Sequence, residues 1–220
     1  MSDDIESYLS PKLVDDAKTR EFGASFAFHQ TNSSLWKKAI SDPDIDLVIS
    51  AEPKEMTAQY SSQILFSSFY SCLYDGPRLN LRSPLTRGEY LSHEYVRIAF
   101  DGRRGYVDDL LEKEDGTASR SRLVHALRGF ASILAFGSAI ATLPTFAAYS
   151  YARIARLTVS PVPIYVPSFR IFMVWTTKRN TDERNQWLRN FVIDRTRELQ
   201  LASQSFTPTA KGTRSAKRRR

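Results

Sequence analysis

The stretch between Arg128 and Arg153 contains no charged residue and sets the tightest limit on how the chain folds. So long a run has to be buried, either in a protein core or in a membrane. Gly137–Ser138 and Pro144 interrupt the run with residues typical of turns. The interruptions favour a buried helix, a turn and a central strand. A membrane span over residues 129–148 is the alternative, and the sequence leaves it open.

Strand-like and helix-like patterns alternate along the rest of the chain. Phe169–Trp175 is the strongest strand pattern, because its large apolar and aromatic side chains suit a buried strand. After Thr181, apolar side chains recur at helical spacing. Other strands are predicted at 25–28, 45–50, 62–66, 69–74, 97–100, 121–126 and 139–143, and other helices from Pro11 and at 35–40, 127–136 and 145–155. Strands that alternate with helices predict an α/β sheet protein.

The net charge of +7 is concentrated at the C-terminal end of the chain. Residues 201–220 hold six of the 31 basic side chains and none of the 24 acidic ones, which leaves about +1 for the remainder. A phosphate-binding surface spread over the folded part would need a larger excess of positive charge. The tail itself is predicted to be solvated and disordered, with nonspecific attraction to DNA as the alternative.

Few residues offer covalent or metal chemistry. Cys72 is the only cysteine, so it forms no internal disulfide, and the three histidines lie far apart in the sequence. No paired carboxylates, nucleophile–base pair or phosphate loop is visible, so we expect neither an enzyme nor a cofactor. The acidic N-terminus lacks the basic start and apolar run of a signal peptide, which predicts a cytoplasmic protein.

One strand-to-helix transition has an unusual loop. The predicted strand 97–100 leads into Asp101-Gly102-Arg103-Arg104-Gly105, and a helix-like stretch follows from about Tyr106. The loop is either an ordinary turn with two solvated arginines or the rim of a site for an anion. A helix N-terminus beside two guanidinium groups would favour an anion at that place.

Several stretches, in this order, resemble the effector-binding domain of LysR-type transcriptional regulators, especially the branch that senses aromatic compounds. They are SDDIESYLSPKL, LWKKAISDPDIDLVIS, ILFSSFYSCLYDGPRLNLRSPLTRGEYLSHEYVRIAF, IATLPTFAA and FRIFMVWTTKRNTDERNQWLRNFV. The likeness spans about residues 2–195. It implies the type II periplasmic-binding-protein fold, in which two α/β lobes joined by two crossover strands clamp a small molecule.

The resemblance also implies domain boundaries. Residues 1–72 and 169–199 would form lobe I, residues 73–168 lobe II, and residues 200–220 the disordered basic tail. Compared with the family, the chain lacks the upstream helix-turn-helix, and the first strand of lobe I is also expected to be missing. Such a domain would form a homodimer and would contact DNA only through the helix-turn-helix, apart from nonspecific contact by the tail.

The resemblance further implies a ligand-sensing module of a transcription regulator, which binds a small, carboxylate-bearing aromatic molecule between the lobes. A membrane-anchored protein and a solute-binding protein of the same fold are the alternatives. Ser33 would supply a hydroxyl to the ligand or simply cap a helix. Leu127 occupies a position where the aromatic-sensing branch tends to have Phe. The expected ligand-binding residues are Ser2, Asp3, Ser33, Phe100, Arg103, Arg104, Leu127 and Phe169.

Overall fold

The computed structural model describes residues 1–19, 25–98, 107, 109–110, 121–124, 133–135 and 137–205. Helices and strands alternate along these residues, which agrees with the α/β prediction. The helices are α1 (Asp3–Thr19), α2 (Trp36–Ile40), α3 (Gly76–Leu79), α4 (Arg87–Ser92), α7 (Thr145–Ala155), α8 (Glu183–Ser205) and the short η2 (Thr177–Arg179). The strands are β1 (Val48–Ala51), β2 (Tyr60–Ser68), β3 (Tyr70–Tyr74), β4 (Glu94–Ile98), β5 (Ser121–Val124), β6 (Ala139–Pro144), β7 (Thr158–Pro161) and β8 (Phe169–Thr176).

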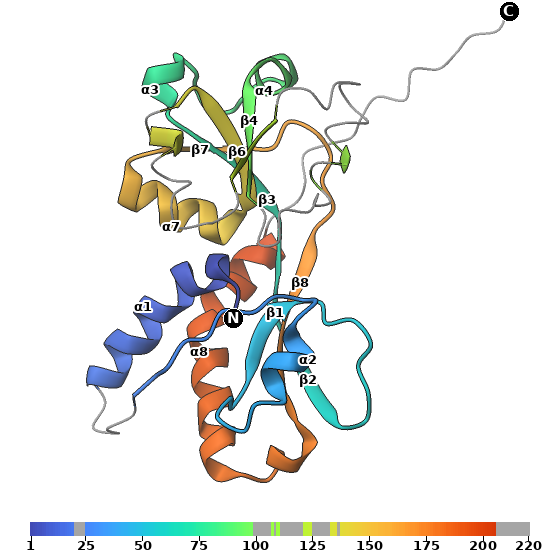
Figure 1. Cartoon of the computed structure of the whole chain (residues 1–220). Helices are drawn as coiled ribbons and strands as arrows, with labels where there is room; N and C mark the ends of the chain where they lie inside the picture. The colour runs from blue at the N-terminus through green and yellow to red at the C-terminus, as the bar shows by residue number, and fades with distance from the viewer. Residues whose placement is uncertain are drawn as a thin grey trace, which may run out of the picture.

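The strands form two separate sheets, one in each half of the molecule (Figure 1). The smaller sheet has the order β1-β8-β2, and both of its strand pairs are antiparallel. The larger sheet has the order β5-β4-β6-β3-β7, in which β4 runs parallel to β5 and to β6. The chain passes from the smaller sheet to the larger between β2 and β3, and it returns between β7 and β8. This arrangement is the two-sheet α/β fold that the sequence predicted.

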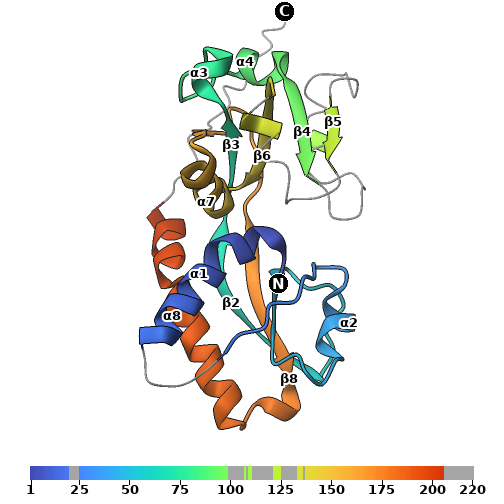
Figure 2. The ribbon, with the colours of Figure 1, turned by 60° about the vertical axis from the view of Figure 1, so that its left-hand side comes forward.

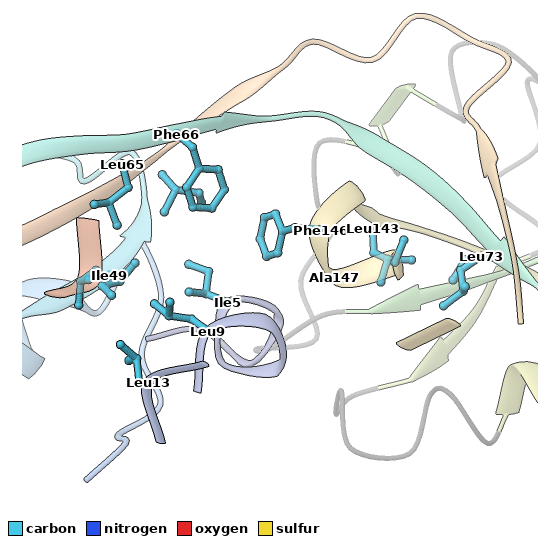
Figure 3. Close-up of a cluster of buried hydrophobic side chains, with 14 of the residues drawn as sticks. Ile5, Leu9, Leu13, Ile49, Leu65, Phe66, Leu73, Leu143, Phe146 and Ala147 are labelled. Atoms are coloured by element: carbon cyan, nitrogen blue, oxygen red, sulfur yellow. The ribbon is translucent and has the colours of Figure 1, made fainter. Parts of the chain in front are cut away.

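One apolar core continues from one half of the molecule into the other. Ile5 and Leu9 of α1 pack in the same buried cluster as Phe66 of β2 and Phe146 of α7. The Phe66 and Phe146 rings meet edge to face, with centroids 5.4 Å apart, and Figure 3 shows them facing each other where the two halves join. Figure 2 shows α1 beside α8 and directly below α7. Helix α1 therefore contacts both halves of the fold.

Within the described residues, the uncharged stretch lies in the protein core from Ala139 to Ala148. Strand β6 is buried over nearly its whole length, and α7 begins immediately after it with Phe146, Ala147 and Ala148 also buried. No helix among the described residues is both long enough and apolar enough to cross a membrane. The expected boundaries of this strand and helix, 139–143 and 145–155, agree with the structure to within one residue.

Two predictions about the first thirty residues are wrong. Residues 25–28 were expected to form a strand, but they belong to neither a helix nor a strand, because no neighbouring strand pairs with them in the described residues. Helix α1 begins at Asp3 rather than at Pro11, which lies inside it. Ile5, Leu9 and Leu13, four residues apart, all bury their side chains in the core, and this packing keeps one helix on both sides of the proline.

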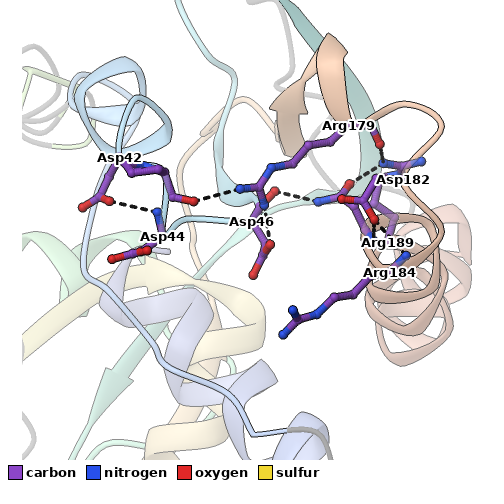
Figure 4. A network of polar contacts seen from close by, with 9 residues as sticks. Asp42, Asp44, Asp46, Arg179, Asp182, Arg184 and Arg189 are labelled. Atoms are coloured by element: carbon purple, nitrogen blue, oxygen red, sulfur yellow. Dashed lines mark hydrogen bonds and ion pairs between the residues drawn. The ribbon is translucent and has the colours of Figure 1, made fainter.

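A polar network holds the start of α8 against the loop before β1 (Figure 4). Arg179 donates to the Asp46 carboxylate and to the Pro43 carbonyl oxygen, the latter at 2.8 Å. The Arg189 guanidinium lies 4.5 Å from the Trp175 ring centroid and donates to the Arg179 carbonyl oxygen at 3.1 Å.

Helix α8 continues to Ser205, so residues 200–205, expected at the start of a disordered tail, are helical.

Candidate functional site

The two connections between the sheets run beside each other. Strands β2 and β8 stay paired up to Ser68 and Phe169, the last partners before the chain crosses. Phe169 also contacts Tyr70 on the other connection, and the centroids of the two rings lie 5.0 Å apart. Phe169, one of the predicted site residues, is therefore at the junction between the two halves. We call residues 66–71 and 162–170 the hinge.

The N-terminal turn of α7 is attached to the hinge. The backbone N–H of Thr145 donates to the Phe69 carbonyl oxygen at 2.9 Å. The hydroxyl oxygens of Thr145 and Ser71 also lie 2.9 Å apart. Because Thr145 is the first residue of α7, these contacts fix the position of the helix start relative to the crossover strand.

Helix α1 also starts close to the junction, and its first turn is acidic. Asp3, Asp4 and Glu6 lie in this turn, where the helix dipole favours negative charge. Burial raises the pKa of Asp4, while a hydrogen bond with Ser2 and one from the Ile5 N–H, at 3.0 Å, act in the opposite direction. Of the predicted residues, Ser2 and Asp3 are therefore both placed at this helix start.

A buried hydroxyl lies beside the same helix start. Thr31 is 3% exposed, and its Oγ1 has no hydrogen-bond partner among the described residues. Its backbone N–H donates to the Met1 carbonyl oxygen at 3.0 Å, so Thr31 is linked directly to the residue before Ser2. The sequence analysis did not single out Thr31, because nothing in the polar run at residues 30–34 distinguishes it from its neighbours. A buried polar group without a partner is a candidate for contact with a ligand.

Ser33 does not cap a helix. The Asn32 side-chain oxygen accepts from the backbone N–H groups of Ser34 and Leu35, both at 2.9 Å, and α2 begins after Leu35 without a side-chain cap. Asn32 therefore holds this turn, and of the two roles offered for Ser33 the helix cap is wrong. Ser33 itself is partly buried in this turn, two residues after Thr31.

The larger sheet contributes the other side of the predicted site. Strands β4 and β5 are parallel and in register, with Ile98 paired to Val124 at their carboxyl ends. In open α/β sheets, the loops that follow such ends form ligand sites. The predicted residues that follow β4 and β5 in sequence, namely Phe100, Arg103, Arg104 and Leu127, lie outside the described residues.

A groove of about 780 Å³ runs along the hinge between α1, α7 and α8. Its walls include the aromatic rings of Tyr8, Phe146 and Tyr149, and the cations Lys12 and Arg153 also line it. Lys12 donates to Tyr8 Oη at 2.8 Å and to Glu198 at 2.7 Å. Desolvation lowers the pKa of Lys12, but these two bonds outweigh it and leave that pKa raised. Lys12 is therefore held as a cation by partners within the chain.

The described residues provide no catalytic or metal-binding arrangement. They contain no group of three or more His, Cys, Asp or Glu side chains that could hold a metal ion. Cys72 is fully buried in β3, and its burial raises the pKa of the thiol to about 12. A thiol with such a pKa is not a nucleophile at neutral pH.

Comparison with protein families gives a match to the LysR substrate binding domain over residues 1–197. The HTH-type transcriptional activator NagR of Ralstonia sp is 28% identical over 197 residues, which are 88% of this chain and 64% of NagR. The corresponding activator NahR of Pseudomonas putida is 26% identical over 196 residues, 88% of this chain and 65% of NahR. The chain thus spans a little under two thirds of the length of these relatives, which are activators and not enzymes.

Solved structures have the same fold. The regulatory domain of MexT, a transcriptional activator in Pseudomonas aeruginosa, superposes with a TM-score of 0.76 at 25% identity, covering 88% of this chain and 96% of that domain. A putative transcriptional regulator from Vibrio parahaemolyticus gives a TM-score of 0.75 at 22% identity, covering 90% of this chain and 93% of that one. These likenesses agree with the fold predicted from the sequence.

Proposed function

The chain belongs to the family of LysR substrate-binding domains, and from this we propose that it is the ligand-sensing module of a cytoplasmic transcription regulator. The ligand is a small aromatic molecule with a carboxylate, bound between the two halves of the fold. The part that contacts DNA is a helix-turn-helix outside this chain. The domain itself carries out no reaction.

The main support for this proposal is that the starts of α1 and α7 are both attached to the junction between the two halves. Helix α7 is hydrogen-bonded to the hinge through Thr145, and α1 packs on both halves through Ile5 and Tyr8. A ligand that contacts residues of both halves would favour one relative arrangement of the two sheets. Sensing then follows from the difference in affinity between two arrangements.

We propose an orientation of the ligand that fits the charge around the helix starts. The α1 side is acidic, with Asp3, Asp4 and Glu6 in one turn, and would repel a carboxylate. We therefore propose that the carboxylate binds Arg103 or Arg104, which follow β4 in sequence, because a guanidinium can bind it with two parallel hydrogen bonds. The proposed position of the ring is toward the hinge, which contains Phe169, and the proposed polar contact is the Thr31 hydroxyl.

A thermal-shift experiment with benzoate as the probe tests this assignment. We expect benzoate to raise the melting temperature, and neutral benzamide, which has the same ring, to have a much smaller effect. The variants Arg103→Ala and Thr31→Val should each weaken the benzoate shift, measured against the ligand-free melting temperature of the same variant. Arg82→Ala is the matched control, because Arg82 is exposed in the loop between α3 and α4.

Two outcomes would contradict the assignment. If benzoate and related aromatic acids give no shift, the ligand class is wrong. If they give a shift that is equal in Arg103→Ala, Thr31→Val and Arg82→Ala, the ligand binds elsewhere. In that case the groove along the hinge is the next site to test, with Arg153→Ala as the variant.

We also propose that the domain forms a homodimer through the exposed apolar side chains Tyr149 and Ile154 of α7. These two side chains are 60% and 77% exposed, and both border the groove along the hinge. Light scattering should give a dimer for the parent chain and a monomer for Ile154→Lys. Leu35→Lys, at another exposed apolar position (41%), should leave the mass unchanged. A parent chain that is monomeric at high micromolar concentration would contradict the proposal.

A further inference from the structure

Helices α1 and α7 form the main contact between the two halves outside the hinge. Helix α1 belongs to the half with the smaller sheet, because it packs along α8 and its Lys12 donates to Glu198 of that helix at 2.7 Å. Helix α7 belongs to the other half, since it follows β6 directly and packs on β3. Within the described part of the chain, no other pair of elements from different halves makes a comparable contact outside the hinge.

The apolar part of the α1–α7 contact does not fix how the two helices are aligned. The Tyr8 ring of α1 meets the Phe146 ring of α7 edge to face, with centroids 6.1 Å apart. Ile5 and Leu9 of α1 share a buried cluster with Phe146 and Ala147. Apolar packing is non-directional, so two helices can shift along each other and still bury most of this surface. A directional contact is needed to hold them in one position.

A short series of hydrogen bonds provides such a contact. The Tyr151 phenol of α7 is hydrogen-bonded to the Ser7 side chain of α1. The Ser7 hydroxyl donates to the Asp4 carbonyl oxygen at 2.8 Å, so the phenol is the donor to Ser7. The Asp4 carboxyl group is hydrogen-bonded to the Ser2 side chain and to the Ile5 N–H. The series therefore runs from α7 through the first turn of α1 to Ser2, one of the predicted ligand-binding residues.

The surroundings of Tyr151 keep its phenol protonated, as a hydrogen-bond donor must be. Burial raises the pKa of the phenol, and the negative charges of Asp4, Asp3 and Glu6 act in the same direction, while the Ser7 hydrogen bond acts against them. The phenol therefore holds its proton throughout the neutral pH range. Tyr151 is also partly buried, and a hydrogen bond in such a place is weakened less by water than one on an open surface.

We propose that Tyr151 is a positioning residue, which sets the arrangement of the two halves by holding the first turn of α1 against α7. Ser2 and Asp3 in this part of the chain then keep a fixed place relative to the larger sheet. The consequence for ligand affinity rests on the proposed function, in which a ligand lies between this turn and the residues that follow β4. When α1 shifts along α7, the two sides of that site move apart, and the ligand has to restore the alignment at a cost in affinity.

The first test needs no ligand and measures the distance between the two halves. Lys38→Cys on α2 and Arg78→Cys on α3 place one spin label on each half of the whole chain, and both positions are exposed. Cys72 is fully buried and does not compete for the label. Dilution with unlabelled chain restricts the measured distances to pairs within one molecule. We expect one narrow distance distribution in the labelled parent and a shifted or broader distribution in Tyr151→Phe and in Ser7→Ala.

Two further variants are the controls. Ser7→Thr keeps the hydroxyl, and its added methyl group has room because Ser7 borders the groove along the hinge. Tyr165→Phe removes the hydroxyl of a side chain that is 66% exposed. Both controls should keep the narrow distance distribution of the parent. Tyr151→Phe combined with Ser7→Ala should resemble either single variant, since each of them breaks the same hydrogen bond.

Benzoate affinity, measured by calorimetry, is the second readout. Tyr151→Phe and Ser7→Ala should weaken benzoate binding about three- to tenfold, whereas Ser7→Thr and Tyr165→Phe should leave it unchanged. An unchanged distance distribution in both Tyr151→Phe and Ser7→Ala would overturn the proposal, even if the two variants have lower melting temperatures, because Tyr151 would then only add stability. If the distance changes but the parent does not bind benzoate, the positioning role of Tyr151 stands and the ligand class proposed above is wrong.

Discussion

The hydroxyl oxygens of Ser71 and Thr145 lie 2.9 Å apart, and they join the crossover strand β3 to the first residue of α7. Ser71 is 6% exposed, so loss of its partner would leave a buried hydroxyl unpaired. We expect Thr145→Val and Ser71→Ala each to lower the free energy of unfolding by about 1–2 kcal/mol. The double variant should lower the free energy of unfolding by less than the sum of the two single losses, as measured by urea unfolding.

Ser150→Ala is the control for this pair. Ser150 is also on α7, but its hydroxyl donates to the Phe146 carbonyl oxygen within the same helix, so its loss should have little effect on stability. Strict additivity of Ser71→Ala and Thr145→Val would mean that the two hydroxyls do not interact in solution.

Arg189 is predicted to matter more for stability than its neighbour Arg184 on the same helix. The Arg189 guanidinium lies over the Trp175 ring and donates to carbonyl oxygens of Arg179 and Asn180. Within the described residues the Arg184 side chain makes no hydrogen bond or ion pair (Figure 4). Arg189→Met should therefore lower the free energy of unfolding by about 1–3 kcal/mol, and Arg184→Met by less than about 0.5 kcal/mol.

Urea unfolding followed by tryptophan fluorescence measures both variants. If both variants lost the same free energy of unfolding, the contacts of Arg189 at the start of α8 would contribute no more to stability than a solvated arginine does.

The sequence predicted those elements whose local pattern and tertiary packing agree. The helix 145–155 and the strand 169–175 were found within one residue, because each carries a continuous apolar pattern that the core uses. Residues 25–28 have the alternation of a strand, but a strand also needs a partner, which local sequence does not reveal. At Pro11 the local rule predicted a helix start, and core packing by Leu9 and Leu13 outweighed it.

The candidate site was predicted less fully than the fold. Ser2 and Asp3 lie at the start of α1, and Phe169 lies in the hinge, and their contact with a ligand stays a prediction. The choice between Thr31 and Ser33 depends on which hydroxyl is buried. The choice between Asn32 and Ser33 as the residue that holds the turn before α2 depends on backbone angles. Neither property is encoded in residue type, so three polar neighbours could not be ranked from sequence.

Tyr90 and Thr142 form a buried polar pair in the larger sheet. The Tyr90 hydroxyl lies 2.6 Å from Thr142 Oγ1, and both residues are less than 10% exposed. Tyr90→Phe removes one partner and leaves the Thr142 hydroxyl buried, so we expect a loss of about 1–2 kcal/mol by urea unfolding. Combining it with Thr142→Val, which removes the hydroxyl that is left with only the Cys72 thiol as a partner, should restore part of the loss. A double variant that is no more stable than Tyr90→Phe alone would contradict this account.

The thiol of Cys72 is predicted to be unreactive in the folded protein. It is the only cysteine, so reaction with a thiol reagent reports on this position alone. Burial raises its pKa from 9.0 to about 12, so almost no thiolate is present at pH 8. Ellman's reagent at pH 8 should therefore react slowly with the native chain and rapidly after unfolding in urea. Rapid reaction of the native chain would show that β3 is accessible.

The same pKa predicts how the stability contributed by Cys72 changes with pH. Because the folded pKa lies above that of the unfolded chain, the folded state holds the thiol proton more tightly between about pH 9 and 12. The contribution is fully present below about pH 9 and is lost as the pH rises toward 12. Cys72→Ala has no such titration, so the difference in unfolding free energy between the parent and this variant should shrink from pH 8 to pH 11. Tyrosine and lysine titrations are shared by both proteins, so they cancel in the difference between the two unfolding free energies. If that difference stayed constant from pH 8 to pH 11, the thiol would be in contact with water.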